Sequence, residues 1–400
     1  MRNGRITLRL VTVVALLLLG GSVAAQGPVR ELQSVSQGMV LASGTAWKQV
    51  NESGFGYPNN NHVTALEVFR GQLYASASNA ENGAGIWRTK RPVTWRRVVS
   101  SGFGNPTNAV IFDMIEFHGE LYAGTGSWSH DGAPGQIWRS CNGVDWALVE
   151  GGGFGNANNT GIVNFGIFRN TLYAGTVNNA DGLEIWRSRT GNSGDWSRVV
   201  VNGKDDAGNT ITDGFIDFHG FFYVAVETPA DGHGGEIWRT KDGRTWTSVM
   251  TGGFGDTDNS GMGGFAVFGG YLYVGTGNAT TGTQIYRSHN GTTWTQVVGN
   301  GFGDTNNWKA ESLIAFNGRL YAGTKNLTTG IEVWSSCDGT TWEQANDNGF
   351  GDEGNSGTLW SVGTVAYNGN LYIGTENADG GEVWSLLHDQ RCSVRRSPRD

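Results

Sequence analysis

Four ionisable side chains could carry catalytic chemistry, because each stands near the start of an apolar stretch that recurs along the chain. They are His62, Asp213, Lys309 and Glu311. Two carboxyl groups that face each other across a site can act as acid and base in the cleavage of a glycosidic bond. We therefore take Asp213 and Glu311 as candidate catalytic carboxyls, with Lys309 and His62 as further candidates beside them.

A second group of side chains has the composition of a sugar-binding surface. Three tryptophans stand outside the regular positions that tryptophan occupies in the rest of the sequence. Aromatic rings stack on sugar rings, and neighbouring polar groups bind the hydroxyls. The candidate ligand-binding residues are Trp128, His130, Asp131, Glu227, Trp308 and Trp360. The alternative is that the tryptophans fill the centre of the fold and the charged side chains are solvated.

Calcium is the only cofactor that the residue pattern suggests. Asp256 and Asp258 are its candidate ligands, but their spacing is not that of a known calcium loop. An Asx turn explains the same residues. The seven histidines show no metal-ligand spacing, and no glycine-rich loop joins a strand to a helix. We therefore predict no resident cofactor, with calcium as the alternative.

The composition restricts the elements that can position these side chains. The chain has 400 residues, of which 65 are glycine, 16 tryptophan and 7 proline. A helical protein does not tolerate this much glycine, a disordered chain lacks the aromatics, and a collagen-like chain needs more proline. Many short strands joined by glycine turns remain.

The sequence repeats itself seven times with a period of 48–51 residues. Each unit has a Gly-Phe-Gly segment (Gly203-Lys204-Asp205 in the fourth unit), a Leu-Tyr-Ala-Gly-Thr-like stretch and an Ile-Trp-Arg-Ser-like stretch. The tryptophans that begin the period are Trp47, Trp95, Trp146, Trp196, Trp246, Trp294 and Trp342. A period of this length with four alternating runs is typical of a β-propeller. We predict an all-β, seven-bladed propeller of four-stranded blades (strands A to D) over residues 45–387.

The register of the repeats also predicts how the propeller closes. Trp47 precedes the first unit, whereas the seventh unit ends at Trp384 without a fourth strand. We expect the segment around Trp47 to supply that strand, which removes two exposed sheet edges.

Loop lengths distinguish the two faces of this propeller. The A–B turns have constant length, whereas the B–C loops of the second and fourth units and the D–A loop of the seventh are longer. Binding residues concentrate on such loops, so we place the ligand on the face of the D–A and B–C loops.

The hairpins between strands C and D resemble the Asp-box of sialidase-type propellers. They read Ser140-Cys141-Asn142-Gly143, Thr240-Lys241-Asp242-Gly243, Ser288-His289-Asn290-Gly291 and Ser336-Cys337-Asp338-Gly339, each followed three residues later by tryptophan. The resemblance implies a turn-stabilising role for these Asp and Asn residues. Sialidases of this type have six blades and a central arginine cluster, so their activity does not carry over. Asp-box propellers also include xyloglucan-degrading enzymes, sorting receptors and binding domains.

The two ends of the chain have the composition of processing and tail segments. Residues 1–25 combine Arg2, Arg5 and Arg9 with an apolar run and a Val-Ala-Ala site, as in a secretory signal peptide. Residues 26–44 read as a linker and residues 388–400 as a basic, disordered tail. We therefore expect a secreted, extracellular protein without membrane insertion. Because the formal net charge is −8, we expect no nucleic-acid partner, and we expect a monomer.

Three cysteines leave at least one thiol unpaired. Cys141 and Cys337 occupy the same position three blades apart, which is too far for a disulfide. Cys392 lies eight residues after Trp384, beside the sixth unit, so Cys337–Cys392 is the better pairing.

These observations favour an exported binding protein that is directed at glycans or is adhesive, with a glycan, a polysaccharide or a surface protein as partner. One alternative is a carbohydrate-active hydrolase or lyase with a single site at the centre. A protein-interaction scaffold is the other.

Overall fold

The structure, a computed structural model, describes residues 47–127, 133–228, 232–357, 363–387 and Cys392, all within the compact unit 39–400. Nearly all of its secondary structure is antiparallel β-sheet. None of the helices within these ranges is long and apolar enough to cross a membrane.

Each sequence repeat folds into strands that pair in chain order. Repeat 1 forms β2 (His62–Phe69), β3 (Gln72–Ser78), β4 (Gly85–Thr89) and β5 (Arg96–Val99). Repeat 2 forms β6 (Val110–Phe117), β7 (Glu120–Gly126), β8 (Ile137–Ser140) and β9 (Ala147–Glu150). Repeat 3 forms β10 (Gly161–Ile167), β11 (Leu172–Val177), β12 (Ile185–Ser188) and β13 (Ser197–Val200).

The later repeats follow the same order. Repeat 4 forms β14 (Ile211–Phe218), β15 (Phe221–Glu227), β16 (Glu236–Thr240) and β17 (Trp246–Met250). Repeat 5 forms β18 (Gly261–Phe268), β19 (Tyr271–Gly277), β20 (Ile285–Ser288) and β21 (Thr295–Val298). Repeat 6 forms β22 (Lys309–Phe316), β23 (Arg319–Lys325), β24 (Val333–Ser336) and β25 (Glu343–Gln344). Repeat 7 forms β26 (Thr364–Tyr367), β27 (Asn370–Gly374) and β28 (Val383–Leu386).

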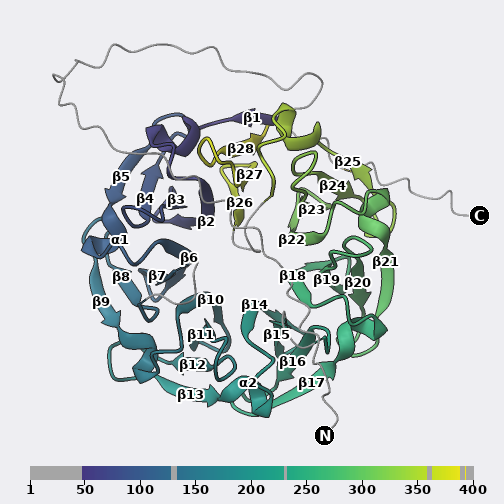
Figure 1. Cartoon of the computed structure of the whole chain (residues 1–400), viewed down its shortest axis with the longest axis horizontal. Coiled ribbons are helices and arrows are strands. Elements are labelled where there is room, and N and C mark those ends of the chain that lie inside the picture. Colours follow the sequence, from purple (N-terminus) through teal and green to yellow (C-terminus); the bar gives the residue numbers. More distant parts are fainter. Residues whose placement is uncertain (1–46, 128–132, 229–231, 358–362, 388–391, 393–400) are drawn as a thin grey trace, which may run out of the picture. The chain divides into compact units, whose positions relative to one another are not determined.

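The repeats follow one another around a common centre, with the first strand of each repeat innermost (Figure 1). Short bridges join neighbouring repeats, such as Gly126 with Gly161 and Val177 with Ile211. This is the arrangement of a β-propeller.

The two ends of the propeller pair as the sequence predicts. Strand β1 (Trp47–Gln49) runs antiparallel to β28, and Gln49 lies opposite Trp384. The Trp47 indole N–H donates to the carbonyl of Ala345 at 2.8 Å, and its ring meets the Phe350 ring edge-on. The first described strand therefore completes the sheet of the last repeat.

The Gly-Phe-Gly segments form short helical turns before the inner strands. They are η1 (Ser53–Gly56), α1 (Ser101–Gly104), η2 (Gly152–Gly155), α2 (Asn202–Asp205), η3 (Gly252–Gly255), η4 (Asn300–Gly303) and η5 (Asn348–Gly351). Two successive residues in each turn have left-handed φ values, for example Gly102 at 56° and Phe103 at 61°. Glycine at the first position lowers the strain of this backbone.

The hydrophobic core lies between neighbouring sheets. One cluster joins Phe117 and Tyr122 of repeat 2 to Ile162 and Phe165 of repeat 3, and similar clusters recur between other repeats. Successive side chains of a strand point to opposite faces of the sheet, so apolar side chains on each face pack against a different neighbouring repeat.

The C–D hairpins have the hydrogen bonds that the sequence predicts for their Asp or Asn. An Asp242 carboxylate oxygen accepts the backbone N–H groups of Arg244 and Thr245, both at 2.8 Å, and Gly243 has a φ of 72°. These bonds hold the pKa of Asp242 well below its usual value. The carboxylate thus stabilises its own turn.

The structure contains the Cys337–Cys392 disulfide, and Cys141 is an exposed free thiol. The bridge ties Cys392, beyond the last strand, to the C–D hairpin of repeat 6.

Candidate functional site at the inner rim

Charged side chains gather at one end of the inner strands. Lys309 and His62 are the first residues of β22 and β2, Glu227 and Lys325 are the last residues of β15 and β23, and Glu376 lies just after β27. We call these positions, together with the first three residues of each inner strand, the inner rim. The D–A and B–C loops lie at this end of the strands, where the sequence places the ligand.

A repeated β-bulge determines which inner-rim side chains leave the regular ladder. The pairing of the inner strand with its neighbour shifts register after the second residue, so the ladder skips the third residue. The residues at this position are Thr64, Phe112, Val163, Asp213 and Glu311 in repeats 1, 2, 3, 4 and 6. A bulge commonly redirects a side chain next to a functional site. The fold thus gives both candidate catalytic carboxyls equivalent positions.

Lys309 connects repeat 6 to repeat 4. Its Nζ lies 2.9 Å from Glu227 Oε2 and 3.4 Å from Asp213 Oδ2, and its side chain is only 4% exposed. The lysine stem passes repeat 5, where Gly261 and Gly277 leave room. A Cβ added at Gly277 would lie 3.2 Å from Lys309 Cγ and Cδ. The path of the lysine side chain past repeat 5 therefore depends on glycine at this position.

The charge state of this trio follows from burial and attraction. Burial alone would lower the pKa of Lys309, but the attraction of Asp213 and Glu227 outweighs it, so the lysine stays charged. Burial raises the pKa of Asp213 well above its usual value, although Lys309 opposes the shift. Burial also acts on Glu227, yet the lysine charge lowers its pKa. Lys309 therefore pairs mainly with an ionised Glu227, while Asp213 favours its neutral form.

A second charged group completes the rim. Glu376 Oε1 lies 3.2 Å from His62 Nε2, and Glu376 Oε2 lies 2.9 Å from Lys325 Nζ. Burial would raise the pKa of Glu376, but His62 and Lys325 lower it to about 2. Trp308 joins this group, because Lys325 Nζ is 5.8 Å from the centre of its ring.

Glu311 is buried between these charges. Burial raises its pKa to about 7, and the nearby Lys325 and Lys309 limit the shift. Its Oε2 atom and the Oδ1 atom of Asp213 are buried without a hydrogen-bond partner. Each buried, unpaired carboxyl oxygen is costly unless water or a ligand occupies the free position.

The opposite part of the rim is apolar. Val110 and Phe112 of repeat 2, with Val163 and Val177 of repeat 3, form one buried cluster, and Ile211 packs against it. The first three residues of the inner strands are therefore apolar in repeats 2 and 3, whereas the charged residues of the rim belong to repeats 4, 6, 7 and 1.

The structure brings six of the ten sequence candidates for catalysis and ligand binding to this rim. They are His62, Asp213, Glu227, Trp308, Lys309 and Glu311. Trp128, His130, Asp131 and Trp360 lie outside the described residues. Sequence reasoning missed Lys325 and Glu376. Lys325 ends the second strand of repeat 6 and Glu376 lies just after that of repeat 7, the position that Glu227 has in repeat 4, so comparison of that position across the repeats could have found them.

The two calcium candidates are placed in a turn. Asp256 Oδ1 accepts the Asp258 backbone N–H at 3.1 Å, and Asp256 Oδ2 accepts the side-chain amides of Asn278 and Gln284. Within the described ranges, no group of three or more His, Cys, Asp or Glu side chains could hold a metal ion. The calcium alternative therefore rests on the sequence alone.

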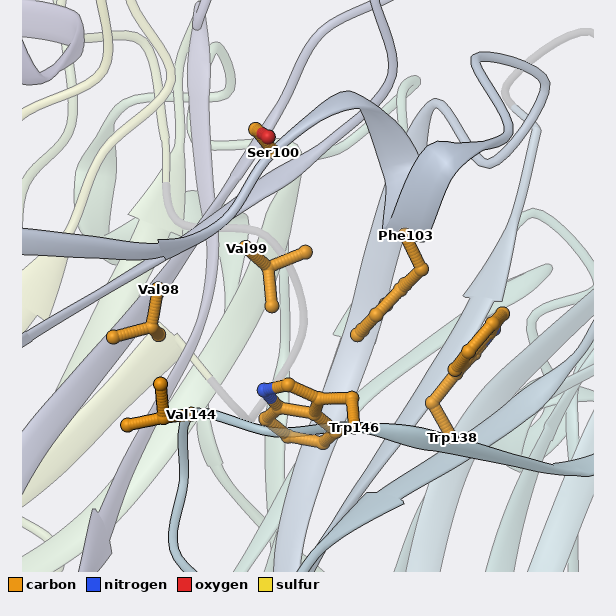
Figure 2. A pocket seen from close by; sticks show the side chains of 7 residues that line it. All are labelled: Val98, Val99, Ser100, Phe103, Trp138, Val144 and Trp146. Carbon is orange, nitrogen blue, oxygen red and sulfur yellow. The ribbon is translucent and has the colours of Figure 1, made fainter.

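An aromatic pocket between repeats 1 and 2 is a different kind of feature. Figure 2 shows its lining residues, Val98, Val99, Ser100, Phe103, Trp138, Val144 and Trp146, around a volume of about 230 Å³. Phe103 stacks on Trp138 at 4.7 Å, and the same Phe–Trp stacking recurs between other repeats, as in Phe154–Trp186. Because this contact is part of the repeated packing and the volume is small for a ligand site, we place the candidate site at the rim.

Comparison with solved structures shows the fold. No protein-family model and no curated protein matches the sequence. An ancestral GH74 enzyme matches with a TM-score of 0.56 at 11% identity, over 82% of this chain and 48% of that one. A PL25 ulvan lyase bound to a GlcA–Rha3S saccharide matches with a TM-score of 0.51 at 11% identity, over 86% and 95%. A chain of the mitotic checkpoint complex matches with a TM-score of 0.54 at 10% identity, over 92% and 100%.

These likenesses are at low identity, so they support a β-propeller and nothing more specific. This chain spans about half the length of the GH74 enzyme and of a prolyl endopeptidase that it also matches.

Proposed function

We propose that the protein is an exported, seven-bladed β-propeller that binds a saccharide at the inner rim. The export rests on residues 1–25, and the number of blades rests on the seven sequence repeats. The Asp-box resemblance of the C–D hairpins supports the same architecture. Two of the similar propellers act on carbohydrates by their printed descriptions, which agrees with this ligand class.

The observation that carries the proposal is the pair of buried carboxyl oxygens without partners, Asp213 Oδ1 and Glu311 Oε2. A carboxyl oxygen accepts a hydrogen bond and, where it carries the proton, donates one, and a sugar hydroxyl can match either role. Trp308 adds a half-buried aromatic ring at the charged part of the rim, on which a C–H face of a sugar can stack. A pyranose ring needs both kinds of surface, because it carries hydroxyls at its edge and C–H groups on its faces.

A specific observation favours catalysis as the second candidate function. The pKa of Glu311 is raised to about 7, whereas that of its neighbour Glu376 is lowered to about 2. Two carboxyls whose environments separate their pKa values can act as acid and base. In a hydrolase or lyase, Glu311 would donate the proton, with Asp213, Lys309 and His62 as further candidates.

A glycan array followed by turnover assays tests both candidates. We expect the intact chain to bind one or more glycans, and Glu311→Gln and Trp308→Ala to weaken that binding at least tenfold. Glu116→Gln, an exposed carboxyl at the other end of inner strand β6, is the matched control and should bind as the native chain does. Reducing-sugar release and the absorbance of unsaturated uronates then detect hydrolysis or elimination. No glycan binding, or equal loss in the control, would reject the proposal.

A further inference from the structure

The opposite end of the strands carries a basic and aromatic patch shared by repeats 4 and 5, which are neighbours in Figure 1. We call the set His219, Phe221, Arg239, Lys241, Tyr271, Arg287 and His289 the basic patch. His219, Lys241 and His289 are exposed turn residues, and the others are half-buried.

Contacts between the rings make the patch continuous. The Arg239 guanidinium lies 4.2 Å from the centre of the Phe221 ring, and Lys241 Nζ lies 5.9 Å from it. In repeat 5, the Arg287 guanidinium lies 4.5 Å from the Tyr271 ring.

The two repeats meet through their histidines. The rings of His219 and His289 are 6.1 Å apart, and the His289 ring is 5.4 Å from Tyr271.

The repeats supply an internal comparison for the two arginines. In repeat 2, the equivalent Arg139 pairs with Glu120 at 3.1 Å, and Glu120 is the first residue of β7. Phe221 and Tyr271 occupy that position in repeats 4 and 5. An aromatic ring fixes a guanidinium by cation–π attraction but leaves its net charge uncompensated.

The carboxylates nearest to the patch in the sequence do not pair with its cations within the described part of the chain. Asp242 follows Lys241 and carries its own negative charge, but its carboxylate is bound by the N–H groups of its own turn. Asp217 lies opposite Phe222 in the β14–β15 ladder and so projects from the other face of the sheet than Phe221. No ion pair joins Arg239, Lys241 or Arg287 to a carboxylate within the described ranges.

We propose that the basic patch is a second binding surface, which takes an anionic polysaccharide with carboxylate or sulfate groups. Arginines held flat on rings present their outer N–H donors in a fixed fork, which matches carboxylate and sulfate oxygens. The imidazole rings of His219 and His289 add flat surfaces where the two repeats meet.

The charges of the chain and of the patch favour a polysaccharide over a nucleic acid. The chain has 36 acidic against 28 basic residues, and the patch holds three permanent cations. Nucleic acids carry a phosphate charge every ~1.7 Å of duplex and bind surfaces with many more cations. A polyuronate carries one carboxylate on each sugar, so a patch two repeats wide can match its charges.

Surface plasmon resonance on immobilised alginate, with neutral dextran as the reference surface, tests the inference. We expect the intact chain to bind alginate and not dextran, with affinity that falls as salt rises. The double variant Arg239→Gln/Arg287→Gln should raise the Kd at least tenfold. Arg139→Gln is the matched control, because its arginine has a carboxylate partner, and it should change the Kd less than twofold. Lys241→Gln, a substitution of an exposed turn residue, should raise the Kd in a variant whose fold is not at risk.

Three outcomes would overturn the inference. The first is an alginate affinity that is unchanged in both the double variant and Lys241→Gln. The second is a loss of alginate affinity in Arg139→Gln as large as in the double variant. The third is that poly-glutamate or duplex DNA displaces the protein from the alginate surface as effectively as free alginate does. The double variant Arg239→Gln/Arg287→Gln should keep the Trp308-dependent glycan binding of the inner rim unchanged, which separates this surface from the inner rim. A failure of the proposed saccharide site would therefore not be mistaken for a failure of the basic patch.

Discussion

Replacement of Lys309 by methionine tests whether the rim charges are coupled as the structure indicates. Methionine keeps the hydrocarbon stem that passes Gly261 and Gly277 but removes the cation shared by Asp213 and Glu227. Because Asp213 already favours its neutral form, the main consequence falls on Glu227. This carboxyl must then either remain ionised without its cation or take up a proton.

The size and pH dependence of the loss follow from the protonation of Glu227. From its ordinary pKa of 4.5, protonation at pH 7 costs about 3 kcal/mol, since each pH unit corresponds to ~1.4 kcal/mol. Loss of one partner from a buried ion pair typically costs about 3–5 kcal/mol, so the two estimates agree. In the variant the folded-state pKa of Glu227 lies above its unfolded value. The loss is therefore fully present at neutral pH and disappears as the pH falls towards the unfolded value.

Urea denaturation at pH 7 and pH 5 measures this effect. We expect the free energy of unfolding of Lys309→Met to fall by about 3 kcal/mol at pH 7 and by less than about 1 kcal/mol at pH 5. The double variant Lys309→Met/Glu227→Gln should recover most of the loss at pH 7, because glutamine needs no cation. An equal loss at both pH values, or no recovery in the double variant, would refute the coupling.

Three further changes test other parts of the structure. Gly277→Val introduces the side chain that repeat 3 has at Val177 and should displace the Lys309 side chain, which lowers the free energy of unfolding by about 1–3 kcal/mol. An unchanged melting temperature would contradict the requirement for glycine beside Lys309. Cys337→Ser opens the loop of 55 residues closed by the disulfide and should lower the free energy of unfolding by up to about 4 kcal/mol, whereas Cys141→Ser should leave it unchanged. Peptide mapping under non-reducing conditions checks the pairing itself. Deletion of residues 26–52 removes β1 and should abolish cooperative unfolding, and a truncated protein that melts like the full chain would show that closure by β1 is dispensable.

The repeated parts of the fold could be predicted from the sequence because the same residue types recur at the same spacing in every repeat. The pairing of β1 with β28 followed from counting strands between Trp47 and Trp384. The turn hydrogen bonds of Asp242 followed from local chemistry alone, because the carboxylate bonds its own backbone.

The candidate site was predictable only in part. Asp213, Lys309 and Glu311 stand near the start of an apolar stretch, so their place at one end of the inner strands follows from topology. Their mutual contacts do not, because Lys309 reaches across a whole repeat and that reach depends on glycines elsewhere in the chain. Glu376 could not be recognised from loop lengths, because it stands at a regular position of the repeat and changes no loop.

The arginines show the same limit on the other face. The sequence reveals that Arg139, Arg239 and Arg287 are equivalent, but only the structure shows a carboxylate beside the first and an aromatic ring beside the other two. Equivalent residues therefore acquire different charge environments from a single change in the neighbouring strand.

Isothermal titration calorimetry of an array-selected oligosaccharide tests the central claim, that the unpartnered carboxyl oxygens of the inner rim bind sugar hydroxyls. We expect Glu311→Gln and Asp213→Asn each to weaken binding by at least tenfold at pH 6, while Glu116→Gln, at the other end of inner strand β6, leaves the affinity unchanged. Native affinity in both rim variants would contradict the claim.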